Sequence, residues 1–407
     1  MGYSVVIAKP TKACNADCSY CSAPIDDTGK WKFDDFKRII DTIARYFTEE
    51  MDWIWHGGEP MLMGPDFYYE CAEYVKDFPT TIKFAMQTNL LSYNHDRWYD
   101  LFHTTFKGRI SSSFDPYKKF RTVKGNSDTY DRIFWKSLEA ILEDGFHPLL
   151  IGVYDEGGAK NIFDIYKRAI SYGKDTFSFR VNYAYPAGRA KNSGAMIRPK
   201  TYGQMLIDLY DRWLADMPAF AITPLDQMLS KVCGYQNGRC PWTKDCGGRF
   251  LTVDPDGSVW NCSEFSDLND TKLMFGNVLT GEIAPTEEGG ATKRVKPELW
   301  VPQMRSTVAS RKMVERRFNV PLDCRSCRHY SECEGGCMRD AELFDRGLGG
   351  KFYYCQSWKM VFDHIKASVL SGGADAMIRR MKYSPEDAKH RLKGYEETRK
   401  EIIASIC

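Results

Sequence analysis

The sequence predicts an α/β fold, in which a partial (β/α)6 barrel of the TIM type is followed by a smaller cysteine-rich domain. From the first residues to about Pro186, short apolar strands alternate with amphipathic helices, a pattern typical of a parallel sheet covered by helices. After about residue 230 this alternation stops, cysteines become denser, and Gly and Pro recur. We therefore predict three units, a barrel over 1–230, a second domain over 231–370 and a C-terminal helical segment over 371–407.

The elements of the barrel follow from the spacing of apolar residues. Six strands are expected over 3–8, 51–56, 82–88, 109–114, 147–154 and 177–185. A helix over 33–47 places Phe36 and Ile43 on one apolar stripe. The other barrel helices are expected over 64–77, 129–144, 161–172 and 201–215. Further along, 284–298 reads as an exposed loop and 385–406 as a terminal helix.

Composition excludes several classes of partner. The 407 residues carry 56 basic and 54 acidic side chains, a formal net charge of +2, so we expect neither nucleic acid nor an anionic membrane as a partner. We find no apolar run long enough to span a membrane and no secretory signal before the first strand. We therefore expect a cytoplasmic protein, in which the 14 clustered cysteines are metal ligands rather than disulfides.

Three cysteines follow the first predicted strand with the spacing C-x3-C-x2-C, namely Cys14, Cys18 and Cys21. Three thiolates on one loop can hold three irons of a cubane iron–sulfur cluster and leave the fourth iron open. An open iron can bind a substrate or a cofactor, which is a catalytic rather than an electron-transfer feature. The alternative is a zinc site completed by a distant Cys or His.

The second domain carries eight more cysteines at short spacings. They are Cys240, Cys246, Cys262, Cys324, Cys327, Cys333, Cys337 and Cys355. Between Cys246 and Cys262, two alternating runs flank a strong turn signal at 254–257, so a hairpin should bring these two cysteines together at its open end. Eight thiolates suffice for two fully ligated four-cysteine clusters, although two zinc sites, or one zinc and one iron–sulfur site, would use the same ligands.

The motifs at the strand ends resemble those of the radical S-adenosylmethionine (SAM) superfamily. The second predicted strand ends in "GGEP", residues Gly57, Gly58, Glu59 and Pro60, the third in "QTN" with Gln87 and Asn89, and the fourth in "SSSFD" with Ser113 and Asp115. The resemblance implies that GGEP contacts the amino group of SAM, and that Ser113 and Arg121 hold its ribose and carboxylate. Tyr20 and Tyr185 are candidates to pack on the adenine.

The later cysteines resemble the SPASM extension of radical SAM enzymes, found in anaerobic sulfatase maturases and peptide-modifying enzymes. The resemblance implies one [4Fe-4S] cluster that binds SAM and two auxiliary [4Fe-4S] clusters. One auxiliary cluster would be held by Cys240, Cys246, Cys262 and Cys337, and the other by Cys324, Cys327, Cys333 and Cys355. It also implies reductive cleavage of SAM to a 5′-deoxyadenosyl radical, which abstracts a hydrogen atom from the substrate.

One residue departs from the sulfatase-maturase pattern. Those enzymes have a catalytic aspartate directly after the cysteine that resembles Cys262, where this chain has Ser263. A serine hydroxyl is a poor base near neutral pH. Glu264 and Asp115 are the other catalytic candidates, but if 263 and 264 lie on a strand their side chains point to opposite faces. The departure favours a C–C or thioether crosslink over formation of formylglycine.

The predicted function is therefore modification of a side chain in a ribosomal peptide or protein. The alternatives are a sulfatase-maturase-like oxidase, a radical SAM enzyme acting on a small metabolite, and a non-catalytic zinc protein. Because Cys14 lies so near the start of the sequence, we expect no peptide-recognition domain ahead of the barrel. The substrate would then dock on the barrel directly or be presented by a separate recognition protein. An electron donor such as flavodoxin or ferredoxin is also expected.

Overall fold

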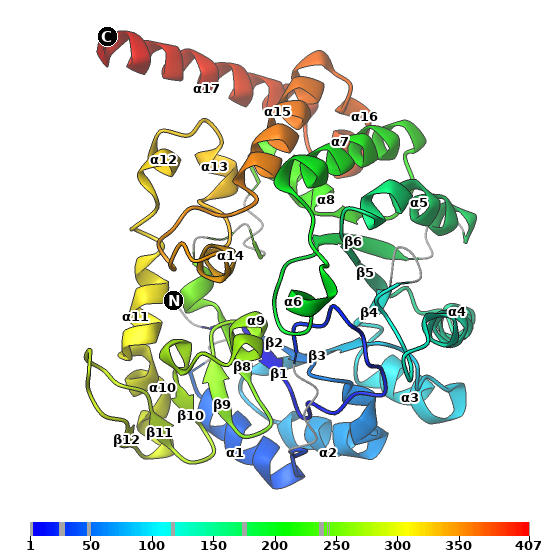
Figure 1. Cartoon of the computed structure of the whole chain (residues 1–407), viewed down its shortest axis with the longest axis vertical. Helices are drawn as coiled ribbons and strands as arrows, with labels where there is room; N and C mark the ends of the chain where they lie inside the picture. Colours follow the sequence, from blue (N-terminus) through cyan, green and yellow to red (C-terminus); the bar gives the residue numbers. More distant parts are fainter. Residues whose placement is uncertain are drawn as a thin grey trace.

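One continuous sheet of twelve strands forms the centre of the computed structural model (Figure 1). The structure describes residues 3–23, 29–46, 50–114, 119–172, 177–235, 240–241, 243 and 245–406. The strands follow one another in the order β12-β11-β10-β9-β8-β1-β2-β3-β4-β5-β6-β7. The predicted α/β fold class is confirmed.

The strands β1 to β7 are parallel and lie in chain order, as in a partial barrel. They are β1 (Val5–Ala8), β2 (Glu50–Trp55), β3 (Thr81–Thr88), β4 (Ile110–Phe114), β5 (Leu149–Tyr154), β6 (Ser178–Tyr183) and β7 (Ile222–Thr223). The first six lie where the sequence predicts them. The two-residue β7 was not predicted, because so short a run carries no periodic signal.

Helices cover the outer face of this sheet. They are α1 (Phe33–Ala44), α2 (Pro65–Val75), α3 (His95–Thr104), α4 (Ser127–Glu143), α5 (Ile162–Ser171), α7 (Pro199–Asp216) and α8 (Leu225–Val232). The four-residue α6 (Ala190–Ser193) follows β6 and lies over the opening of the barrel instead (Figure 1). All five predicted barrel helices are present. The sequence analysis missed α3, because only Trp98, Leu101 and Phe102 of this helix are buried and so narrow a stripe gives a weak pattern.

The second half of the chain joins the same sheet. It contains β8 (Phe250–Val253), β9 (Ser258–Trp260), β10 (Gly276–Asn277), β11 (Glu282–Ile283), β12 (Lys293–Arg294), α9 (Ser263–Leu268), α10 (Pro297–Arg305), α11 (Val308–Glu315), α12 (Leu322–Arg325), α13 (Tyr330–Cys333), α14 (Met338–Leu343), α15 (Cys355–Ser371), α16 (Asp375–Arg380) and α17 (Pro385–Ile406). Short 3-10 helices cover Pro60–Met63, Gly158–Asn161, Cys246–Gly248 and Thr271–Leu273. The predicted terminal helix over 385–406 has the bounds of α17.

The hairpin predicted around residues 254–257 is present and attaches the second half to the barrel. Its strands β8 and β9 are antiparallel, with Thr252 opposite Trp260. In addition β8 pairs in parallel with β1, with Val5 opposite Phe250 and Ala8 opposite Val253. The sheet therefore contains strands from both sides of the expected domain boundary at residue 230.

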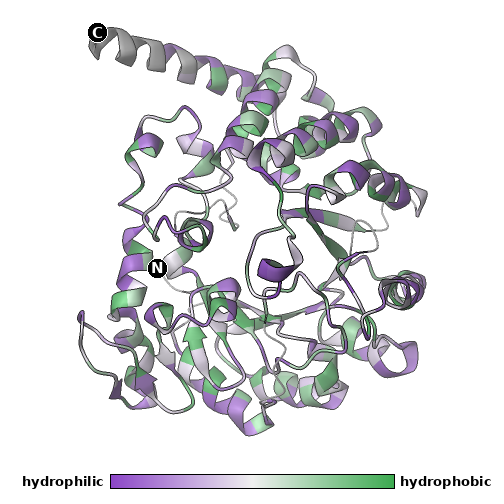
Figure 2. Ribbon diagram, in the orientation of Figure 1, coloured by the Kyte–Doolittle hydropathy of each residue, from purple (hydrophilic) through white to green (hydrophobic). Residues whose placement is uncertain are grey.

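A second contact between the halves is a helix pair. Helix α15 lies along α7 (Figure 1), and the ring of Tyr354 stacks on Tyr183 of β6 at 3.8 Å between centroids. The Tyr354 hydroxyl donates to the carbonyls of Ala184 and Ile197, so this contact is polar as well as apolar. Figure 2 shows hydrophobic residues along the strands and hydrophilic ones on the outward surfaces of the helices.

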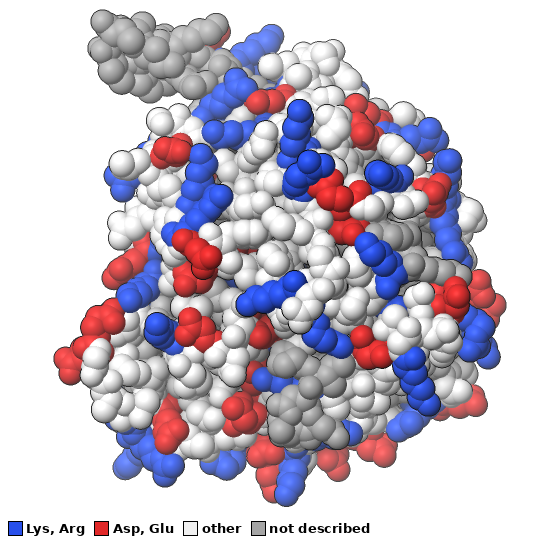
Figure 3. Space-filling view, viewed as in Figure 1, with Lys and Arg blue, Asp and Glu red and all other residues white. Residues whose placement is uncertain are grey.

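The surface carries mixed charge. On the face shown in Figure 3, basic and acidic side chains alternate without a large patch of one sign. This pattern agrees with the formal net charge of +2. In the part of the chain that the structure describes, no helix is both long enough and apolar enough to cross a membrane.

Candidate functional site

The loop that carries Cys14, Cys18 and Cys21 follows β1 and is held from below by the GGEP segment. The backbone N–H of Gly58 donates to the carbonyl of Thr11 at 2.9 Å, and that of Glu59 donates to the carbonyl of Ala13 at 2.9 Å. These bonds fix the start of the cysteine loop against the end of β2.

The two glycines permit this close approach. A Cβ on Gly57 would lie 2.3 Å from the carbonyl oxygen of Thr11, and one on Gly58 would lie 2.2 Å from that of Ala13. Gly57 also has a φ of +117°, which L residues with side chains rarely adopt. In the structure these glycines let the backbone approach the cysteine loop, and their predicted close approach to a ligand stays a prediction.

Gly58→Ala is therefore expected to displace the loop, because a backbone carbonyl cannot move away as a flexible side chain could. Overpacking of this kind costs about 1–3 kcal/mol of stability, and the variant should lose the iron of this one site. Iron analysis after anaerobic purification measures the loss. Gly349→Ala is the control, since an added Cβ there meets nothing within 4 Å. Unchanged iron content in Gly58→Ala would contradict this role of the glycine.

Glu59, which follows β2, is hydrogen-bonded to residues at the end of β3. Its carboxylate accepts from the backbone N–H groups of Met61 at 2.9 Å and Asn89 at 2.7 Å, and from the Thr88 hydroxyl at 2.7 Å. Burial raises the pKa of Glu59 to about 7, against the lowering effect of these donors. Glu59 and Pro60 lie beneath the cysteine loop rather than in the lining of the cavity above it. The predicted contact of Glu59 with an ammonium stays a prediction.

A cavity of about 680 Å³ opens above the cysteine loop. Most of the residues predicted to bind SAM line it: Tyr20, Gly57, Gly58, Gln87, Asn89, Ser113 and Arg121, together with the three cysteines. Gln87 Nε2 donates to Ser113 Oγ at 2.9 Å, and Asn89 Nδ2 lies 3.8 Å from Cys14 Sγ. The ends of β1, β3 and β4 thus meet at one site. Asp115, which the sequence analysis named as a catalytic candidate, lies outside the described residues.

Aromatic rings frame the guanidinium group of Arg121 in this cavity. The guanidinium lies 5.3 Å from the ring centroid of Tyr20 and 5.7 Å from that of Tyr130, and it also donates to the Tyr130 hydroxyl at 3.3 Å. These contacts orient the guanidinium group of Arg121 at the edge of the cavity, where it can bind a carboxylate. Lys12, His56 and Arg189 line the same cavity and were not predicted to do so.

A larger cavity, of about 1330 Å³, occupies the interior of the barrel. Tyr20, Cys21, Gln87, Ser113 and Arg121 line both cavities, so the two are contiguous. The far wall comes from the second half of the chain and consists of Cys240, Cys246, Phe250, Cys262, Ser263, Glu264 and Asp267. Tyr185, predicted near the adenine, lines only this larger cavity.

The structure brings Cys240, Cys246, Cys262 and Cys337 together. Cys240, Cys246 and Cys337 line one small cavity, and Cys262 faces the barrel interior beside the first two. Burial raises the pKa of Cys246 and of Cys262 well above the usual value of a thiol, helped by the thiols of Cys240 and Cys337 at Cys246 and by the Glu264 carboxylate at Cys262. Such thiols become thiolates only beside a metal, whose charge favours the ionised form.

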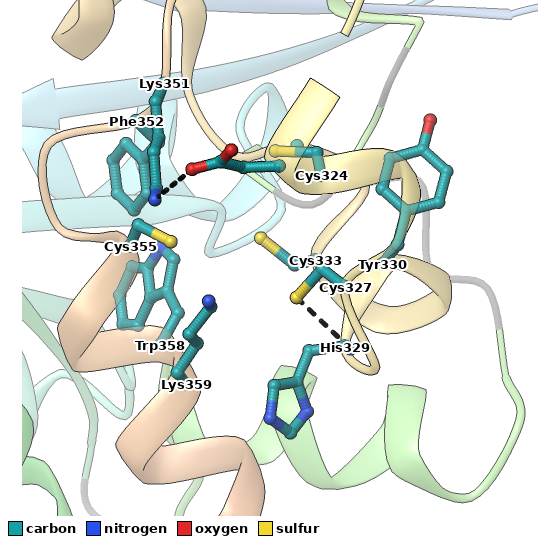
Figure 4. A pocket seen from close by; sticks show the side chains of 12 residues that line it. Cys324, Cys327, His329, Tyr330, Cys333, Lys351, Phe352, Cys355, Trp358 and Lys359 are labelled. Carbon is teal, nitrogen blue, oxygen red and sulfur yellow. Dashed lines mark hydrogen bonds and ion pairs between the residues drawn. The ribbon is translucent and has the colours of Figure 1, made fainter. Parts of the chain in front are cut away.

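The other four cysteines surround a separate cavity of about 430 Å³ nearer the surface (Figure 4). Cys324, Cys327, Cys333 and Cys355 point into it, and Lys351, Lys359 and Trp358 complete its lining (Figure 4). Among the described residues, no three Cys, His, Asp or Glu side chains converge on one point as the ligands of a single ion do. The thiols instead surround cavities, an arrangement that fits polynuclear clusters.

Two further described cysteines, Cys71 and Cys233, lie apart from the three groups. Cys71 in α2 is fully buried, as predicted for a small apolar side chain, and Cys233 is buried at the end of α8. Cys407 lies outside the described residues.

The sequence argument about Ser263 and Glu264 was wrong in one respect. These residues begin α9 rather than continuing a strand, because the chain turns at Cys262. Both side chains therefore face the large cavity. Burial alone would raise the pKa of Glu264, but Arg339, 3.6 Å from its carboxylate, and the Cys262 thiol lower it to about 2.

The sequence analysis missed a buried ion cluster around Lys9, at the end of β1. Its Nζ lies 2.6 Å from Asp267 Oδ1 and 3.9 Å from Asp254 Oδ1, and it donates to Ser266 Oγ at 2.8 Å. Burial would lower the pKa of Lys9, but the two carboxylates outweigh it and raise the pKa. The only signal in the sequence was the position of Lys9 directly after an apolar strand. A lysine is normally exposed, so this position did not predict a buried ion pair.

Comparison with known proteins agrees with this arrangement. The family model of the Radical SAM superfamily matches residues 8–155. A cysteine-type anaerobic sulfatase-maturating enzyme of Clostridium novyi is 23% identical over 380 residues, which are 88% of this chain and 94% of that protein. A serine-type enzyme of Klebsiella aerogenes is 25% identical over 354 residues, 82% of this chain and 79% of that protein.

Two solved structures share the fold. Native anSMEcpe with bound AdoMet and Cp18Cys peptide matches with a TM-score of 0.74 at 18% identity, over 91% of this chain and 99% of that chain. Streptococcus suis SuiB bound to the precursor peptide SuiA matches with a TM-score of 0.59 at 14% identity, over 88% and 76%. The likeness extends through both halves of the molecule.

Proposed function

Because this chain contains a radical SAM domain over residues 8–155 and is a homologue of anaerobic sulfatase-maturating enzymes, we propose that it oxidises one side chain of a peptide or protein substrate by radical chemistry. One observation carries the proposal. Two adjoining cavities with shared lining residues lie between the three-cysteine loop and three cysteines of the inner group, Cys240, Cys246 and Cys262, so a substrate between them could meet both.

The three-cysteine loop would hold a [4Fe-4S] cluster whose open iron binds SAM. When bound and reduced, such a cluster would supply the electron for cleavage of SAM to methionine and the 5′-deoxyadenosyl radical. The chain's own residues bind and orient the cofactor: Arg121 lies where it can fork onto a carboxylate, and Gln87 and Ser113 offer polar groups at the adjacent strand ends. The enclosing barrel keeps water from the radical.

We favour oxidation of a Cys or Ser side chain to formylglycine over the crosslink that Ser263 first indicated. The relatives that align over most of the chain include both cysteine-type and serine-type anaerobic sulfatase-maturating enzymes. The crosslink rested on Ser263 as a lost base, and the helical start of α9 weakens that argument, because other acidic side chains face the same cavity.

Oxidation of the substrate radical also needs an acceptor for one electron. The two four-cysteine groups would hold the iron–sulfur clusters that accept this electron. The outer group lies near the surface, where Leu322 is 77% exposed two residues before Cys324. We propose that an external one-electron carrier, such as flavodoxin or ferredoxin, exchanges electrons with the enzyme. The peptide would dock directly at the barrel mouth or be presented by a separate recognition protein.

The test is anaerobic turnover of the reconstituted enzyme with SAM, a chemical reductant and sulfatase-derived peptides that carry Cys or Ser at the target position. Formation of 5′-deoxyadenosine together with a peptide that reacts with an aldehyde-specific hydrazide supports the proposal. Formation of 5′-deoxyadenosine with a crosslinked peptide that lacks an aldehyde would overturn the formylglycine assignment and support the crosslink.

A further inference from the structure

We propose that Asp267 is the base that accepts the proton released when the substrate radical is oxidised, an inference that rests on the proposed function. Ser263 and Asp267 lie one helical turn apart in α9, at positions i and i+4, and both line the large cavity. The carboxylate that is missing at position 263 is therefore presented from the next turn of the same helix face.

Two contacts fix the carboxylate of Asp267 at the cavity wall. Oδ1 lies 2.6 Å from Lys9 Nζ at the end of β1, and Oδ2 accepts from the Ser22 hydroxyl at 2.8 Å. Ser22 directly follows Cys21, so Asp267 lies beside the loop where the radical is generated. A carboxylate has about four lone-pair positions, and these two contacts leave room for a substrate X–H group.

The other candidate bases in this cavity are engaged differently. His56 accepts at Nδ1 from the backbone N–H of Gly57 at 2.8 Å, so its neutral ring carries the proton on Nε2 and has no free acceptor. Glu264 accepts from the Cys262 thiol at 2.8 Å and faces Arg339, so it belongs to the surroundings of the inner cysteine group. Asp267 is the described carboxylate that reaches the cavity without contacting a cysteine.

The 5′-deoxyadenosyl radical would remove one hydrogen atom from the substrate –CH2–XH group, where X is oxygen or sulfur. The resulting carbon radical would then lose one electron to an oxidised [4Fe-4S] cluster held by the inner cysteine group and the X–H proton to Asp267, as a C=X double bond forms. Where X is sulfur, water would then hydrolyse the C=S bond and release hydrogen sulfide, which leaves the aldehyde. Loss of the electron makes the X–H group strongly acidic, so a carboxylate paired with Lys9 is a sufficient base.

The experiment compares two substitutions that each remove one carboxylate facing Lys9 in the full-length holoenzyme. Asp267→Asn should still form 5′-deoxyadenosine and take deuterium from a Cβ-deuterated peptide, but the yield of oxidised peptide per 5′-deoxyadenosine should fall about 100-fold, as for loss of a general base. Asp254→Asn is the matched control, because Asp254 also faces Lys9 but is not among the residues that line the cavity. The yield of oxidised peptide per 5′-deoxyadenosine from Asp254→Asn should equal that from the wild type.

Rescue separates catalysis from folding. Adding Ser263→Asp to Asp267→Asn should restore most of the yield, because it returns a carboxylate to the same helix face. If the unpaired lysine prevents Asp267→Asn from folding, the pair is compared in the Lys9→Met background, as K9M/D267N against K9M/D254N. Equal yields per 5′-deoxyadenosine in either matched pair would overturn the role of Asp267. Absence of 5′-deoxyadenosine from the loaded wild type would instead overturn the proposed function.

Discussion

Replacing Cys14, Cys18 and Cys21 together by alanine is expected to abolish reductive cleavage of SAM. The three thiols line the cavity where Gln87, Ser113 and Arg121 also meet. The eight other ligand candidates belong to two separate groups of cysteines, one of which faces the adjoining barrel cavity, so the variant should keep their iron. Of about twelve irons in three cubane clusters, about four should be lost.

Cys71→Ala is the control for this variant. Cys71 is fully buried in α2, outside the three cysteine groups, so its loss should leave SAM cleavage and iron content unchanged. Formation of 5′-deoxyadenosine by the triple variant at the wild-type rate would show that SAM is cleaved elsewhere in the molecule.

Lys9→Met is expected to destabilise the protein by about 3–5 kcal/mol, the usual cost of breaking a buried ion pair. Both of the carboxylates that face the ammonium, Asp254 and Asp267, are nearly inaccessible to solvent. Removal of the lysine leaves them with one charged partner fewer, at the point where β1, β8 and α9 meet. Thermal unfolding of the loaded protein measures the effect as a fall in midpoint temperature.

The exposed pair Lys83 and Glu50 provides the comparison. These side chains lie 2.5 Å apart but are 44% and 63% exposed, so Lys83→Met should change the stability by no more than about 1 kcal/mol. If Lys9→Met were no more destabilising than Lys83→Met, the buried ion cluster would not contribute to the stability of the contact between β1, β8 and α9.

Local patterns predicted the barrel well because each of its elements is specified by its own residues. The strands β1 to β6 show an alternation of buried and half-buried positions, and α1 has a wide apolar stripe. The pairing of β1 with β8 could not be predicted in this way. It joins Val5 to Phe250, and no short-range periodicity encodes a contact across such a separation.

The site was predicted where chemistry and family resemblance both apply. The grouping of the eight later cysteines followed from the resemblance, and spacing alone would have left their pairing open. The Lys9 cluster and the helical start of α9 at Ser263 were missed, because each depends on tertiary contacts of residues that look ordinary in sequence. The close approach predicted for the glycines of GGEP is present toward the cysteine loop, and both glycines also line the cavity above that loop; their contact with SAM stays a prediction.

Turnover with a peptide deuterated at Cβ of its target Cys or Ser is the most direct test of radical oxidation of a side chain by this enzyme. We expect deuterium to appear in 5′-deoxyadenosine and the same peptide to become an aldehyde at that residue. If the enzyme loaded with iron and sulfide oxidised neither the Cys peptide nor the Ser peptide and transferred no deuterium, the proposed function would be contradicted.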